Sequence, residues 1–207
     1  MRIVYAFRYF LVVAVVPRFF IAGFVITVAA AAAQVTSAPS ASAEALTPII
    51  LLQMFAAPSG FQLPARRGYY DLLLTSGVPR WQIAVAHCLA SVAPGLLAWL
   101  CVALLELAAT HGRQAICLAA GTCIAVAAVS TMSWAVGVFA SRAAAGMGWL
   151  LVMSIPPIAG VASPLHLVGE TNPASPFSIA VLLAALIASS VACLQIVLGE
   201  ARLEAAQ

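Results

Sequence analysis

Long apolar stretches fill nearly the whole chain, and short polar or Gly/Pro-rich breaks separate them. A transmembrane helix needs roughly 20 mostly apolar residues to cross the hydrocarbon core of a bilayer. Six of the stretches are long enough, so we predict six membrane spans in one transmembrane domain that covers residues 1–207. The expected spans are 19–35, 46–63, 82–108, 115–139, 144–165 and 177–198.

The start of the first span depends on Arg18, which interrupts the first apolar run together with Pro17. A span centred further upstream would bury Arg18 near the bilayer centre at a cost of about 2.5 to 3.5 kcal/mol, so we place the span after it. Residues 1–16 then form a short helix at the cytoplasmic membrane interface, with arginines at the headgroups and aromatic side chains as anchors. The alternative is a secretory signal peptide, because a basic start, an apolar core and small residues at 29–33 have that outline.

Composition agrees with this pattern. Of the 207 residues, 64% are hydrophobic and only 7% are charged, whereas soluble domains carry about 25% charged residues. We therefore predict an all-α integral membrane protein. The chain has no lysine, and only Arg113 of its nine arginines lies on the outer side of the predicted membrane, which places both termini in the cytoplasm. The net charge of +3 then reflects membrane orientation, and no nucleic-acid partner is expected. The arginines on the cytoplasmic side are Arg2, Arg8, Arg18, Arg66, Arg67, Arg80, Arg142 and Arg202.

Two spans contain helix breakers or amides. In the second span, Gln53 and Pro58 lie in a helix otherwise suited to lipid. Such residues are tolerated at membrane depth where a neighbouring helix or a water-filled cavity satisfies the polar groups. Gln53 therefore either borders a translocation pathway or forms a hydrogen bond to a neighbouring helix.

In the fifth span, Pro156 and Pro157 remove two backbone donors and disfavour a straight helix. We expect a break near Pro156 and a re-entrant external segment over residues 156–176, shielded from lipid by protein. Both prolines are candidate pathway or helix-break residues.

Residues typical of catalysis are scarce. The three histidines are far apart, and neither they nor the cysteines have the spacing of a metal site, so no metal, cofactor or catalytic residue is expected in this chain. An intramembrane hydrolase could only pair Ser133 or Ser154 with His87. A P-loop requires a lysine, which the chain lacks, so any ATP hydrolysis takes place in another subunit.

One charged, amphipathic segment interrupts the apolar pattern, and we name residues 66–80 the docking segment. Its helical spacing places Tyr69, Leu72 and Leu73 on one face, which is able to insert into a groove on a partner. Asp71 lies in the first turn, where it favours the helix dipole, and Gly77 fits a C-terminal cap. The simpler alternative is a helix that only lies on the membrane surface.

The sequence Arg67-Gly68-Tyr69-Tyr70-Asp71-Leu72-Leu73-Leu74-Thr75-Ser76-Gly77-Val78-Pro79-Arg80-Trp81 resembles the coupling-helix motif of type-2 ABC transporter permeases. The shared features are a glycine start, an acidic residue three positions on, a leucine run, a turn and a basic residue before span three. The layout of the chain is also similar to that family. Tyr69-Tyr70, Asp71, Gly77 and Pro79 depart from the usual residues of the motif.

The resemblance implies a permease subunit of an ATP-driven exporter in the bacterial inner membrane. Such a subunit pairs with a second copy or a related permease to form the substrate pathway, contacts membrane lipids, and docks separate P-loop ATPase subunits that bind ATP and Mg²⁺. Alternatives are a non-transporting membrane scaffold or assembly factor, a haem-export-type permease of cytochrome c maturation, and an intramembrane hydrolase. The residues implied in ATPase docking are Arg66, Arg67, Gly68, Tyr69, Tyr70, Asp71, Leu72, Leu73, Gly77 and Arg80.

Overall fold

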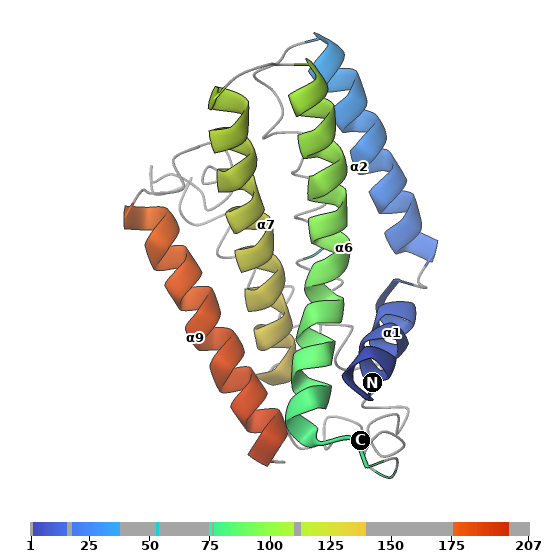
Figure 1. The fold of residues 1–207 in the computed structure, drawn as a ribbon, viewed down its shortest axis with the longest axis vertical. Coiled ribbons are helices and arrows are strands. Elements are labelled where there is room, and N and C mark those ends of the chain that lie inside the picture. Colours follow the sequence, from blue (N-terminus) through green and yellow to red (C-terminus); the bar gives the residue numbers. More distant parts are fainter. Residues whose placement is uncertain are drawn as a thin grey trace.

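The computed structural model describes residues 2–15, 18–37, 53, 75, 77–109, 113–139 and 176–198. These residues form five helices and no strand (Figure 1). The helices are α1 (Arg2–Val15), α2 (Arg18–Ser37), α6 (Arg80–Ala109), α7 (Arg113–Phe139) and α9 (Pro176–Leu198).

Three of these helices are long and apolar enough to cross a membrane, over Arg80–Leu105, Ala120–Phe139 and Ile179–Leu198. They support a multi-pass membrane protein, and the described residues confirm the all-α prediction. The bounds of α2, α6, α7 and α9 agree within two residues with the predicted spans one, three, four and six. The count of six stays a prediction, because the other two spans, apart from Gln53, lie outside the described residues.

The four long helices run in two opposite directions. In Figure 1, α2 and α6 ascend while α7 and α9 descend, which is the order expected of spans one, three, four and six in a six-span chain. Arg80 at the start of α6 and Arg113 at the start of α7 consequently lie at opposite ends of the molecule. This arrangement agrees with the uneven distribution of arginines in the sequence.

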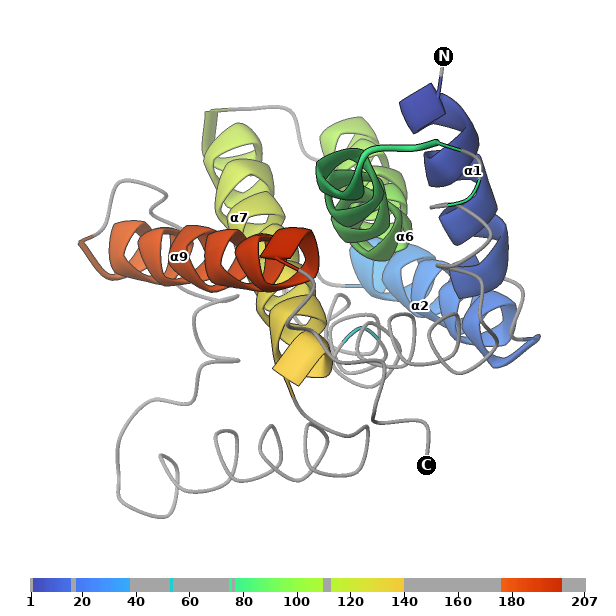
Figure 2. The same ribbon diagram turned by 90° about the horizontal axis from the view of Figure 1, so that it is seen from below.

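Helix α6 is the centre of the described fold, because it packs against α1, α2, α7 and α9. Viewed from below, α1 and α2 lie on one side of α6, and α7 and α9 lie on the other (Figure 2). Thus α6 lies between the two sides of the described bundle and contacts both.

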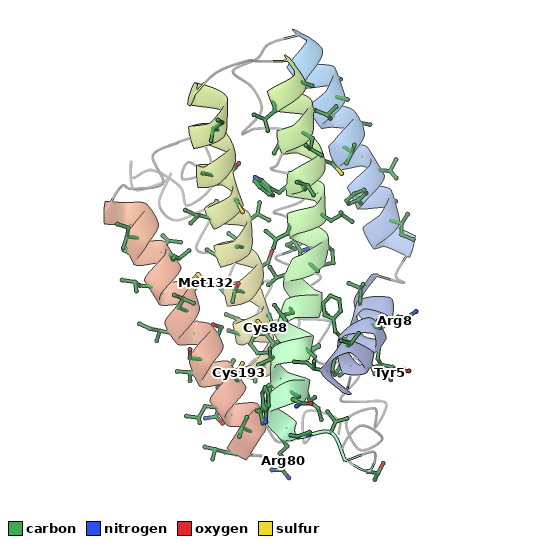
Figure 3. All side chains as sticks on the ribbon, in the orientation of Figure 1. Tyr5, Arg8, Arg80, Cys88, Met132 and Cys193 are labelled. Atoms are coloured by element: carbon green, nitrogen blue, oxygen red, sulfur yellow. The ribbon has the colours of Figure 1, made fainter. Side chains whose placement is uncertain are left out.

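The short helix α1 is amphipathic and packs on the lower half of α6. Ala6 and Phe10 are buried in the core, whereas Val4, Tyr5 and Arg8 are exposed (Figure 3). A helix with one packed face and one face carrying tyrosine and arginine suits a membrane interface. The predicted helix over residues 1–16 therefore has the expected extent, and its position at the lipid headgroups stays a prediction.

Candidate functional site

A buried stripe of polar, aromatic and glycine residues joins α6 to α7. Most buried polar side chains of the described residues lie along it, at positions where the surrounding helices are otherwise apolar. We name this set the polar seam. Its members are His87, Ser91, Gly95 and Trp99 of α6; Thr122, Ser130, Ser133 and Trp134 of α7; and Gln53.

At the lower end of the seam, His87 and Trp134 form a buried hydrogen bond. The indole Nε1 of Trp134 donates to Nδ1 of His87 over 2.9 Å. In this pair the indole N–H is the donor and the imidazole Nδ1 is the acceptor. The ring of Phe10 packs on the imidazole with centroids 4.5 Å apart. His87 therefore links α1, α6 and α7 at one point.

In the middle of the seam, the side-chain amide of Gln53 contacts the α6 backbone on either side of Pro94. Pro94 lies inside the helix and has no N–H, so the carbonyl four residues earlier loses its usual donor and the helix is prone to kink. With its amide turned so that both groups are satisfied, the Gln53 side-chain nitrogen donates to the Ser91 carbonyl over 3.2 Å, and its oxygen accepts from the Gly95 N–H over 2.8 Å. A regular helix joins those two backbone groups directly, and they are the pair next to the one that Pro94 interrupts, so the Gln53 amide bonds to α6 beside the proline.

Gly95 makes this contact possible by leaving room for three neighbours. A Cβ at this position would lie 3.1 Å from the Gln53 amide, from Ser130 Oγ and from Val126 Cγ1. Only glycine lets these groups approach the α6 backbone without displacement. The amide of Gln53 and the hydroxyl of Ser130 thus border the same point on α6.

Ser130 and Ser133 differ from the other hydroxyls of the described spans. Hydroxyls in membrane helices commonly donate to a carbonyl one turn earlier, as Ser91 does to the carbonyl of His87 and Thr131 does to that of Ala127. The hydroxyls of Ser130 and Ser133 are completely buried and have no such partner in the described structure. Each unpaired buried hydroxyl costs about 1 to 3 kcal/mol, and such a group calls for an explanation.

The upper end of the seam repeats the pattern of the lower end. Trp99 Nε1 donates to Thr122 Oγ1 over 3.1 Å. As the contact points in α6 ascend from 87 through 95 to 99, those in α7 descend from 134 through 126 to 122. The two helices are therefore antiparallel and held in one register by their buried polar contacts.

The end of the docking segment is joined firmly to the bundle. Gly77 has a φ of 72°, the left-handed conformation expected of a C-cap glycine, and it follows the helical residue Thr75. Val78 is buried in the core, and the carbonyl of Pro79 accepts from the N–H groups of residues 82 and 83. Arg80 then begins α6, so the segment 66–80 ends in a turn and its last residue belongs to the following helix.

Arg80 also ties this end to α9. Its guanidinium donates to the Val197 carbonyl over 3.4 Å, near the C-terminus of α9, where carbonyls have no intrahelical donor. Figure 3 shows Arg80 at the lower end of α6, with Cys88 and Cys193 between α6 and α9 above it. Both cysteines are free and partly buried against the core. The start of α6 is thus linked to α9 by a polar contact and by packing.

Three of the residues assigned from the sequence to docking or to a pathway lie among those described: Gln53, Gly77 and Arg80. Gln53 forms a hydrogen bond to a neighbouring helix, and a further role at a pathway stays a prediction. The remaining candidates lie outside the described residues. They are Pro58, Arg66, Arg67, Gly68, Tyr69, Tyr70, Asp71, Leu72, Leu73, Pro156 and Pro157.

Comparison with protein-family models, curated proteins and solved structures finds no match. The likeness of the docking segment to ABC permeases consequently stays a prediction from the sequence.

The seam is built for hydrogen bonding between helices. Within the described part of the chain, no group of histidine, cysteine or acidic side chains is placed to hold a metal ion. Ser133 has no hydrogen-bond partner there, and Nδ1 of His87 accepts from Trp134, so Ser133 and His87 do not form a nucleophile–base contact. Ser154, the other serine considered for a hydrolase, lies outside the described residues.

Sequence reasoning missed most of the seam, although a signal was present. His87, Ser91, Gly95 and Trp99 follow one another at intervals of four residues, and so do Thr122, Val126, Ser130 and Trp134. Residues four apart lie on one face of a helix, so each series marks a facing ridge. Pro94, next to Gly95, marks the position in α6 where a backbone hydrogen bond is missing.

Proposed function

We propose that this chain is the permease subunit of an ATP-driven ABC exporter, which binds P-loop ATPase subunits through the docking segment. The proposal rests on the resemblance of residues 66–81 and on the absence of lysine, which leaves ATP hydrolysis to a partner. It is supported by the multi-pass character of the described helices.

The structural observation that favours this function is the junction between the docking segment and α6. Val78 is buried, Pro79 caps the first turn of α6 and Arg80 is bonded to α9. These contacts would transmit a movement of the docking segment directly to α6 and α9. Coupling by rigid-body motion needs a connection of this kind.

In the proposed cycle, closure of the ATPase pair moves the docking segment, and α6 carries the movement into the membrane. A second permease copy or a related subunit completes the pathway. The membrane is the bacterial inner membrane, with the docking segment and both termini in the cytoplasm.

The test is co-purification of the tagged full chain from its native host in mild detergent. The expected partner is a P-loop ATPase, identified by mass spectrometry and by ATP hydrolysis in the complex. Leu72→Asp and Asp71→Arg are expected to abolish its recovery while the chain still inserts. Arg8→Glu is the matched control, because it also changes charge but lies on the exposed face of α1.

Recovery of the ATPase with both docking variants would show that the docking assignment is wrong. Purification of the unmodified chain with other membrane proteins and no ATPase would instead favour the scaffold or assembly factor.

A further inference from the structure

We propose that α6 contains a hinge at Pro94–Gly95, closed in this structure by the Gln53 amide, with the Ser130 hydroxyl as the partner of that amide in a second conformation. The hinge is a property of the chain alone. Its use in transport rests on the proposed function, whereas its existence does not.

The position of the break suits a hinge. Pro94 lies at the middle of α6, which runs over 30 residues from Arg80 to Ala109. The lower half packs on α1 and is bonded to α9 through Arg80 and to α7 through His87, and the upper half is bonded to α7 through Trp99. The bend between the two halves falls where the backbone ladder is interrupted.

The Gln53 amide acts as a removable clamp on this break. Its two hydrogen bonds, to the Ser91 carbonyl and the Gly95 N–H, occupy groups that are able to bond to each other directly in a helix. When the amide leaves, the Ser91 carbonyl and the Gly95 N–H therefore bond to each other, and both keep a partner. It does require a new partner for the amide, because an unsatisfied amide at membrane depth is costly.

Ser130 supplies that partner. Its hydroxyl is fully buried, has no hydrogen bond in this conformation, and lies as close to Gly95 as the Gln53 amide does. Ser133, one turn further along α7, offers a second unpaired hydroxyl. In one conformation the amide bonds to α6 and the Ser130 hydroxyl is unpaired; in the other the amide bonds to Ser130 while the Ser91 carbonyl and the Gly95 N–H bond to each other.

The expected movement is large enough to measure. About 14 residues separate the start of α6 from the break, or roughly 21 Å of helix. A change of about 20° in kink angle would displace the Arg80 end by roughly 7 Å. Under the proposed function, this is the end that the docking segment moves.

The test is the distance distribution between paired spin labels in the full chain, reconstituted in lipid nanodiscs without any ATPase. The native cysteines are first replaced by alanine. One pair, Trp81→Cys with Phe139→Cys, reports the lower halves of α6 and α7, and the other, Leu104→Cys with Ile116→Cys, reports the upper halves. All four side chains are exposed, so the labels do not disturb the core.

The lower pair is expected to show two distances that differ by roughly 7 Å, and the upper pair a single distance. Ser130→Ala should leave one distance in the lower pair, because the amide loses its second partner. Thr131→Val is the matched control and should keep both distances, since the Thr131 hydroxyl is bonded within its own helix. Pro94→Ala restores the missing N–H and should also leave one distance.

A single distance for the lower pair of the unmodified chain would overturn the hinge, and so would two distances that persist in Ser130→Ala. Helical circular dichroism and a monodisperse elution profile confirm that each variant is folded. These outcomes are independent of ATPase docking, so failure of the hinge and failure of the proposed function are separable.

Discussion

Helices α6 and α9 are both apolar and long enough to cross a membrane, yet 39% of the α6 span is buried within the molecule and only 17% of the α9 span. Helix α6 buries His87 and Ser91 among its packed residues, whereas the peripheral helix α9 exposes leucine and isoleucine along its length. In a bilayer, lipid accepts apolar side chains as well as a protein core does. In these two helices, polar and small side chains therefore face the protein interior, and large apolar side chains are often exposed.

The largest effect expected from this comparison concerns the exposed face of α9. Ile187 lies near the middle of the α9 span and is well exposed, so Ile187→Arg should place a charge in lipid. We expect the insertion free energy of the α9 segment to worsen by about 3 kcal/mol in a microsomal insertion assay. Leu198→Arg, at the end of the helix, should change it far less. Equal effects at both positions would contradict a transmembrane α9.

The next largest effect is expected at the centre of α6. Gly95→Leu forces a side chain into space bordered by Gln53, Ser130 and Val126, and should lower the free energy of unfolding by about 2 to 3 kcal/mol. Ala184→Leu on α9 adds a similar volume to an exposed position and should be nearly neutral. Denaturant titration of the reconstituted chain provides the measurement, and similar losses for both variants would mean that the two helices are equally packed.

A smaller effect is expected from the lower polar contact. Trp134→Phe keeps an aromatic ring but removes the donor to His87, which should destabilise the fold by about 1 kcal/mol. Trp81→Phe is the control, because Trp81 is exposed at the start of α6. Thermal unfolding of both variants tests the prediction, and an unchanged midpoint for Trp134→Phe would show that the contact adds nothing to stability.

The smallest effect is expected for apolar truncation on α9. Leu186 is exposed, so Leu186→Ala exchanges one lipid-facing apolar side chain for a smaller one and should change the free energy of unfolding by less than about 0.5 kcal/mol. The same denaturant titration is the measurement. A loss of 2 kcal/mol or more would indicate that a protein surface covers this face of α9.

The helix bounds were largely predictable because their causes are local. Arg18, Arg80, Arg113 and Pro176 each begin a described helix, and an apolar run of membrane length follows each of them. Desolvation of a charged group and the missing donor of proline act on the helix that contains them, whatever the neighbours are. The conformation of Gly77 was predictable for the same reason, since a C-cap requires positive φ.

The polar seam was not predicted from the sequence because it depends on which faces meet. The ridges through His87 and Trp134 are visible as series at intervals of four residues, but the sequence does not state that they face each other or in what register. Gln53 illustrates the same limit. Its amide needs a partner at depth, and many backbone or side-chain groups in other spans satisfy that need equally well.

The sequence by itself determined the membrane class and the extent of the described helices, because each follows from residues acting in their own segment. Only the tertiary structure decided that Gln53 bonds to α6 beside Pro94, that His87 accepts from Trp134, and that Ser130 and Ser133 stay unpaired. Those outcomes depend on distances between separate helices. In a bilayer, where apolar contact hardly distinguishes protein from lipid, packing geometry and buried polar groups choose among the possible pairings.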